Sequence, residues 1–130
     1  MTDANLHSAT KSALNAKFAN RTALVGVIGR GYVGLPTMVA IGKSGFKVTG
    51  IDTDDKRVEQ INRGISYVDD VPDNILSPLC ESGMIRATAQ YDVIQDLDVI
   101  LVCVPTPITR YKEPNLGPIN NSLSAMANHI

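Results

Sequence analysis

The sequence predicts an α/β fold in which a doubly wound parallel sheet is covered by helices on both faces. Three observations lead to this prediction. Short runs of β-branched and other apolar residues alternate with segments of helical periodicity. The strand-like runs show no polar alternation, as expected for strands that are buried on both faces. A glycine or an aspartate stands at many of the boundaries between the two kinds of segment.

The composition is that of one globular domain. The chain has 130 residues, of which 44% are apolar and 19% charged, so it can bury a core of its own. Residues 1–20 are expected to form a leading segment with a weak helix, because Leu6, Leu14 and Phe18 recur at helical spacing. Residues 21–130 are expected to form the domain itself.

Two strands and one helix are predicted at the start of the domain. The β-branched run 24–28 predicts a buried strand that stops at Gly29. From 32 to 44 the apolar residues recur three and four apart, which predicts a helix, and Gly45 follows it where a left-handed cap residue is favoured. The run 47–51 predicts the second strand.

Two further helices and a short strand are predicted next. Asp54 can cap a helix that ends at Gly64. Another helix is predicted to begin at Pro72, because the missing N–H of proline costs nothing in the first turn, and to end at Gly83. Residues 84–88 then predict a short strand.

The most strand-like stretch of the chain is 98–104. Four prolines after it predict a rigid loop. They are Pro105, Pro107, Pro114 and Pro118. Residues 121–129 predict a last helical segment, and this segment is cut short. We therefore expect the domain to be incomplete at its C-terminus, as a truncated fragment of a larger fold.

Composition and cysteine usage exclude several functions. A net charge of −1 argues against a nucleic-acid surface, and no apolar run is long enough to span a membrane. No secretory signal opens the chain. Cys80 and Cys103 lack CxxC spacing, which predicts two buried, reduced thiols and a cytoplasmic protein. His7 and His129 lie near the two ends, so no metal site is expected.

The most informative motif is the glycine pattern GRGYVG that begins at Gly29. Gly29 permits a tight turn, Gly31 lets the backbone touch a pyrophosphate, and Gly34 lets the helix lie close to the sheet. The N–H groups around Tyr32 and Val33 would face the phosphates at the positive end of the helix dipole. Between a predicted strand and a predicted helix, this pattern indicates a Rossmann-type dinucleotide-binding domain.

Asp52 ends the second predicted strand, about twenty residues after the glycines, where such folds place an acidic residue. A carboxylate there accepts hydrogen bonds from the adenosine ribose hydroxyls and repels a 2′-phosphate. Asp52 therefore predicts NAD rather than NADP as the cofactor. The alternative is that Asp52 only caps the following helix.

Two further residues are candidates for contact with the cofactor. Arg57 could reach back to the adenosine side, although it could equally be a surface charge or, in a minority reading, the partner of a 2′-phosphate. Thr106 follows the last predicted strand and is expected to lie beside the glycine loop, where it can offer a hydroxyl to the cofactor. Alternatively, the prolines on either side of it indicate only a stiff turn. Cys103 is expected to point into packing, without the exposure and base that a nucleophile needs.

Three motifs together resemble the N-terminal NAD-binding domain of the UDP-glucose/GDP-mannose dehydrogenase family. They are residues 29–36 (GRGYVGLP), Asp52 with Arg57, and residues 103–107 (CVPTP). Residues 64–71 (GISYVDDV) and 113–116 (EPNL) look more like the UDP-N-acetylglucosamine, or UDP-N-acetylhexosamine, 6-dehydrogenase branch. The resemblance extends from about residue 23 to the end of the chain.

The resemblance implies an enzyme that oxidises the 6-hydroxymethyl group of a UDP-sugar to a carboxylate with two NAD, for polysaccharide or surface glycan biosynthesis. It places cofactor contacts on the loop from Gly29 to Gly34 and on Asp52, Arg57 and Thr106. The family's catalytic cysteine and sugar-nucleotide pocket would lie downstream, so no catalytic residue is assigned here and this fragment is expected to be inactive alone. The full-length enzyme is expected to be a homo-oligomer.

Two alternatives remain open from the sequence. The chain could be the cofactor domain of another NAD-dependent hydroxy-acid dehydrogenase, although the CVPTP loop and the segment 66–68 count against this. It could also be a non-catalytic module that senses NAD or NADH. The shortened last helix argues against that reading, because a natural module would complete its sheet.

Overall fold

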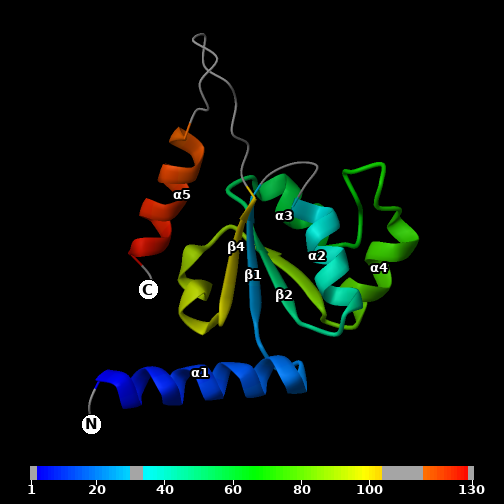
Figure 1. The fold of residues 1–130 in the computed structure, drawn as a ribbon. Helices are drawn as coiled ribbons and strands as arrows, with labels where there is room; N and C mark the ends of the chain where they lie inside the picture. The colour runs from blue at the N-terminus through cyan, green and yellow to red at the C-terminus, as the bar shows by residue number, and fades with distance from the viewer. Residues whose placement is uncertain (1–2, 30–33, 104–115, 129–130) are drawn as a thin grey trace.

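The fold is a four-stranded parallel sheet with helices on its two faces, as seen in a computed structural model (Figure 1). The structure describes residues 3–29, 34–103 and 116–128. The strand order is β3-β2-β1-β4, and every neighbouring pair is parallel. The strands are β1 (Val25–Gly29), β2 (Val48–Ile51), β3 (Ile85–Thr88) and β4 (Val99–Cys103).

Five α-helices and one 3₁₀ helix accompany the strands in the described ranges. They are α1 (Asp3–Asn20), α2 (Gly34–Lys43), α3 (Asp55–Asn62), α4 (Asp73–Glu81), the 3₁₀ helix η1 (Tyr91–Asp96) and α5 (Gly117–Ala127). Helices α2, α3 and α4 lie on one side of the sheet, α5 lies on the other, and α1 crosses below the strands (Figure 1).

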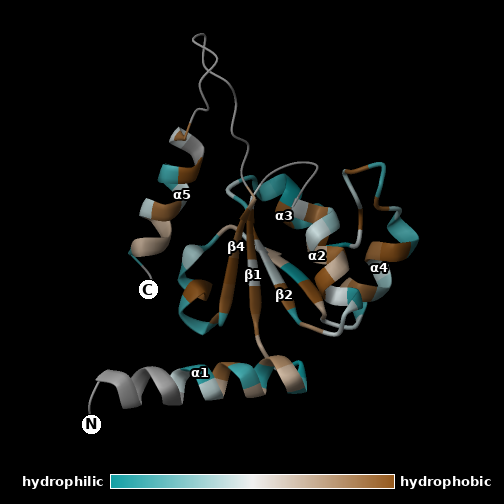
Figure 2. Cartoon of the chain, in the orientation of Figure 1, coloured by the Kyte–Doolittle hydropathy of each residue, from teal (hydrophilic) through white to brown (hydrophobic). Residues whose placement is uncertain are grey.

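The core is divided by the sheet into two clusters, because alternate residues of a strand point to opposite faces. On the α2 side, Val25 and Val27 of β1 pack with buried residues such as Leu35 and Leu76. On the other side, Ile28 packs with residues that include Met126 of α5. The first cluster is much the larger. The strands that contribute residues to both clusters are mostly hydrophobic (Figure 2).

Helix α1 is attached to the amino-terminal end of the sheet by a few contacts. The Nζ of Lys17 donates a hydrogen bond to Oδ1 of Asp98 at 2.8 Å, and the ring of Phe18 meets that of Phe46 edge to face at 6.2 Å. From Thr10 to Asn20 nearly every side chain is exposed to solvent. In the described ranges no helix combines the length and apolar character needed to span a bilayer.

The parallel α/β fold class is confirmed, together with the order of its elements. Three glycines that follow the ends of helices have a positive φ, at 94° for Gly45, 73° for Gly64 and 80° for Gly83. These are backbone conformations that a residue with a Cβ adopts at a cost.

Details of the helices, the sheet and the cysteines differ from the predictions. The 3₁₀ helix η1 was not predicted, and α5 begins at Gly117 rather than at 121, because Pro118 belongs to the first turn of the helix and not to the loop. At β4 the described residues leave the sheet partly uncovered, since Leu101 is 38% exposed. The two cysteines are partly buried rather than buried.

Candidate functional site

The carboxyl ends of β1 and β2 bring the first two predicted site residues together. Ile28 of β1 is in register with Ile51 of β2 in a parallel pair. The next residues along each strand, Gly29 and Asp52, therefore leave the sheet side by side at the same edge. In doubly wound sheets this edge is where ligands bind.

The glycines on either side of the loop differ in how closely other atoms pack against them. A Cβ on Gly29 would lie 2.0 Å from the carbonyl oxygen of Cys103, its partner in β4, so only glycine allows these two strands to pair here. A Cβ on Gly34 would meet the carbonyl oxygen of Gly29 at 3.7 Å, an ordinary van der Waals contact. The start of α2 thus lies close to the end of β1, as predicted, but a methyl group would fit at Gly34.

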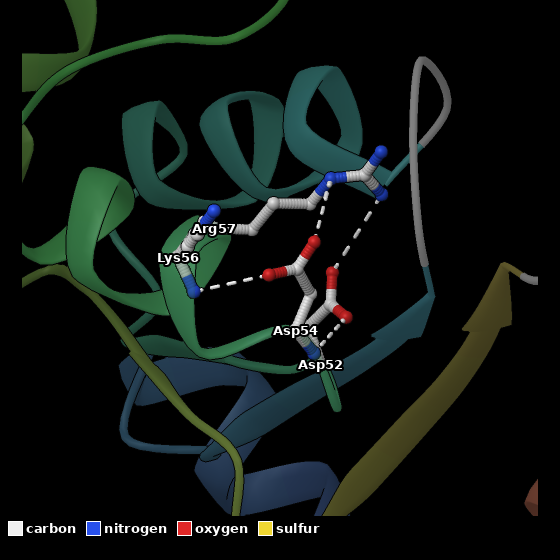
Figure 3. Close-up of polar contacts among 4 residues, drawn as sticks. All are labelled: Asp52, Asp54, Lys56 and Arg57. Carbon is white, nitrogen blue, oxygen red and sulfur yellow. Dashed lines mark hydrogen bonds and ion pairs between the residues drawn. The ribbon is translucent and has the colours of Figure 1, made fainter.

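Asp52 is a buried carboxylate at the tip of β2, with 5% of its surface exposed. Its Oδ1 accepts a hydrogen bond from the backbone N–H of Asp54 at 2.9 Å. The helix cap itself is Asp54, whose Oδ1 accepts from the N–H of Lys56 at 3.0 Å (Figure 3). The structure therefore assigns to Asp54 the capping role that was the alternative for Asp52.

Arg57 reaches back from the first turns of α3 over the two carboxylates (Figure 3). Its NH1 lies 4.0 Å from Oδ2 of Asp52, and its Nε lies 3.8 Å from Oδ2 of Asp54. The side chain is 32% exposed. Arg57 is thus a partly exposed cation that lies against the group around Asp52.

Tyr67 completes this group, although nothing about its position in the sequence predicts a contact with Arg57. The guanidinium carbon of Arg57 lies 5.1 Å from the centre of the Tyr67 ring, within the range of a cation–π interaction. Burial raises the pKa of the Tyr67 hydroxyl, and the charge of Asp52 raises it further, against the opposing effect of Arg57. The ring therefore lies within the electrostatic reach of both charges.

The remaining predicted site residues lie outside the described residues. They are Gly31, Tyr32, Val33 and Thr106, and their contacts with a cofactor stay predictions. In the described part of the chain, no three His, Cys, Asp or Glu side chains are grouped to hold a metal ion. Cys80 donates its S–H to the carbonyl of Ile61 at 3.0 Å, and burial raises the pKa of this thiol, so it is not an activated nucleophile.

Comparison with protein families identifies the family of the chain. Residues 23–130 match the UDP-glucose/GDP-mannose dehydrogenase family, NAD binding domain. The chain belongs to this family. The match confirms the predicted resemblance and the predicted cofactor, NAD, and it leaves α1 outside the matched segment.

Individual dehydrogenases of the family show similarity over most of the chain. UDP-N-acetyl-D-glucosamine 6-dehydrogenase of Salmonella typhi is 36% identical over 95 residues, which are 73% of this chain and 21% of that protein. UDP-N-acetyl-D-mannosamine dehydrogenase of Yersinia pestis is 35% identical over 104 residues, or 79% of this chain and 24% of that protein. The chain thus spans between a fifth and a quarter of the length of these relatives.

A solved structure of the family shares the fold. The crystal structure of a ternary complex of GDP-mannose dehydrogenase from Pseudomonas aeruginosa superposes with a TM-score of 0.76 at 26% identity, covering 82% of this chain and 25% of that one. The Rossmann-type architecture predicted for the chain is therefore confirmed.

The described residues fit the cofactor of the family. NAD carries two ribose hydroxyls on its adenosine half, and a buried carboxylate beside the glycine loop is the group that dinucleotide-binding folds use to hold them. Asp52 occupies this position next to Gly29, with one of its oxygens already fixing the turn that orients it.

Proposed function

We propose that this chain is the NAD-binding part of a nucleotide-sugar 6-dehydrogenase that oxidises the 6-hydroxymethyl group of a UDP-N-acetylhexosamine to a carboxylate. The product would serve polysaccharide or surface glycan biosynthesis. The family match supports the reaction class, and the names of the similar enzymes, for UDP-N-acetyl-D-glucosamine and UDP-N-acetyl-D-mannosamine, support the substrate class.

The observation that carries the proposal is the buried carboxylate of Asp52 beside Gly29. Bound NAD supplies the hydride acceptor of such a reaction. In our proposal Asp52 accepts hydrogen bonds from the adenosine ribose, and the loop from Gly29 to Gly34 holds the pyrophosphate with its backbone N–H groups. Arg57 and Thr106 contact the cofactor as well.

The state of the Cys80 thiol does not favour catalysis by this chain alone. Catalysis in this family would need a nucleophilic cysteine, and Cys80 is a partly buried, hydrogen-bonded thiol with a raised pKa. We therefore propose that the chain binds NAD and forms no NADH from a UDP-sugar. Homo-oligomer formation and a cytoplasmic location are proposed only for the whole enzyme.

Calorimetric titration of the 130-residue chain with NAD tests the role of Asp52. The substitution D52N keeps an oxygen for the N–H of Asp54 but removes the charge, and hydrogen bonds to charged groups contribute about 1.5–3 kcal/mol. We expect D52N to bind NAD at least about tenfold more weakly than the wild type.

Asp98 provides the matched control, because it is a partly buried aspartate at the opposite end of the same sheet. D98N should bind NAD as the wild type does, at a temperature where circular dichroism shows both to be folded. Equal NAD affinity in D52N and the wild type would contradict the assignment of Asp52. Formation of NADH from a UDP-sugar by this chain would contradict the proposal that it is inactive alone.

A further inference from the structure

The guanidinium of Arg57 is held from two sides by side chains that lie outside the glycine motif. On one side its Nε faces Oδ2 of Asp54 at 3.8 Å, and its NH1 faces Oδ2 of Asp52 at 4.0 Å. On the other side the ring of Tyr67 lies 5.1 Å from the guanidinium carbon. The orientation of this cation is therefore set by three neighbours.

The loop that carries Tyr67 is itself fixed to the core. Val68 and Val71 are each 4% exposed and pack in the larger core cluster. The N–H of Ser66 donates to Oδ1 of Asp73 at 2.7 Å, at the start of α4. The hydroxyl of Ser66 also donates to the carbonyl of Val68 at 2.9 Å. Because Ser66 and Val68 are held by these contacts, the backbone of Tyr67 is fixed between them.

Asp54 is fixed as firmly on the opposite side of the guanidinium. Its Oδ1 accepts from the N–H of Lys56 as the cap of α3, so its Oδ2 is left to face Arg57. Its own N–H donates to Asp52. One turn of backbone thus carries both carboxylates that attract the guanidinium.

These contacts bear on which dinucleotide the site accepts. An arginine near the acidic residue of a Rossmann-type site is the group that accommodates the 2′-phosphate of NADP, and it does so best when its planar fork is free to form two parallel hydrogen bonds. Here the charges of Asp52, Asp54 and Arg57 sum to −1. A 2′-phosphate would have to draw Arg57 away from both carboxylates and from the Tyr67 ring.

We infer that Tyr67 and Asp54 are positioning residues that hold the Arg57 guanidinium toward Asp52 and thereby discriminate against a phosphate on the adenosine 2′-oxygen. The inference rests on the proposed function, because it concerns the same adenosine site. It assigns NAD specificity to three groups around Asp52 and not to that carboxylate alone.

The test is the ratio of the dissociation constants for NADP and NAD, measured by calorimetry on the 130-residue chain. Y67L removes the ring face, and D54N removes a charge while retaining a good helix cap. Because an exposed cation–π contact corresponds to about a two- to fivefold change in an equilibrium constant, Y67L should lower the ratio by about this factor. D54N removes an exposed ion pair and should lower the ratio by at most about the same factor. Y67F keeps the ring and should have the same ratio as the wild type.

Two controls separate positioning from general stability. F46L also removes a partly buried ring, but at the other end of the sheet, so it should leave the ratio unchanged. In an R57Q background Y67L should no longer change the ratio, because the group through which Tyr67 acts is gone.

The possible failures are distinguishable. A wild-type chain that binds no NAD would overturn the proposed function. A wild type that prefers NAD, with the same ratio in Y67L and D54N, would overturn this inference and leave the proposed function standing. An effect of Y67L that persists in R57Q would also overturn it.

Discussion

Two aspartates at opposite ends of the sheet show how the same side chain serves different purposes. At the amino-terminal end, both oxygens of Asp98 accept short hydrogen bonds, from Lys17 at 2.8 Å and from the N–H of Leu24 at 2.9 Å. At the carboxyl end, Oδ1 of Asp52 fixes a turn and Oδ2 faces Arg57 at 4.0 Å, beyond hydrogen-bonding distance from that nitrogen.

Asp98 thus holds strands together, whereas Asp52 lies in the candidate site. Asp98 joins the beginnings of β1 and β4, since its own N–H also donates to the carbonyl of Leu24 at 2.8 Å. Asp52 is the more deeply buried of the two, yet Arg57 approaches it only to ion-pair distance. Changes at the amino-terminal end should therefore alter stability alone, and changes at the carboxyl end should alter binding as well.

Substitution of Gly29 by alanine should have the largest effect on stability. The added Cβ would lie 2.0 Å from the carbonyl oxygen of Cys103, so β1 and β4 would have to separate at the site. We expect a loss of about 3 kcal/mol in the free energy of unfolding, at the upper end of typical overpacking costs. Urea denaturation measures this loss. A loss below about 1 kcal/mol would show that the strands separate easily at the carboxyl end.

Substitution of Asp98 by asparagine should have an intermediate effect that depends on pH. The hydrogen bond from Lys17, followed by that from the N–H of Leu24, lowers the pKa of Asp98 in the folded protein. A carboxyl group with a lowered folded pKa stabilises the fold above its unfolded pKa and loses that contribution as the pH falls through the folded pKa. At pH 7 we expect D98N to be about 1.5 kcal/mol less stable than the wild type, at the low end for hydrogen bonds to a charged group because the pair is partly exposed.

The pH dependence gives this prediction its check. Denaturation curves of the wild type and D98N should converge as the pH falls below about 4, the usual pKa of an unfolded aspartate. A difference that stays constant down to the acid limit would mean that Asp98 acts through packing and not through its charge.

Substitution of Gly83 by alanine should have the smallest effect. A Cβ at this position would meet no atom within 4 Å, so the only cost is the positive φ of 80°. We expect a loss of about 1 kcal/mol in the free energy of unfolding, with a smaller loss for G83N, because asparagine tolerates the left-handed conformation better. If G83A were as destabilising as G29A, backbone conformation and not the close approach of strands would explain both.

Much of the fold could be predicted because local chemistry marks its boundaries. Gly45 and Gly64 end helices with positive φ, and Asp54 caps α3, as their positions in the sequence indicated. The 3₁₀ helix Tyr91–Asp96 could not be predicted, because such short turns carry no extended periodicity. The start of α5 was missed because a proline in the first turn of a helix resembles a proline in a loop.

The site was predictable only where a motif fixes it along the chain. The place of Asp52 beside Gly29 could be predicted, because the second strand ends there, next to the strand that leads into the glycine loop. Tyr67 was not, because its contact with Arg57 depends on how the loop between α3 and α4 folds back, and this is a tertiary property. The sequence could suggest that Arg57 is near the site, but not that Asp54 shares it.

The mode of attachment of α1 bears on how freely this helix can vary. The helix precedes the segment that the family shares, and a surface ion pair and one edge-to-face ring contact connect it to the sheet. Neither contact involves the carboxyl ends of the strands. A terminal helix joined in this manner can change in length without altering the carboxyl ends of the strands.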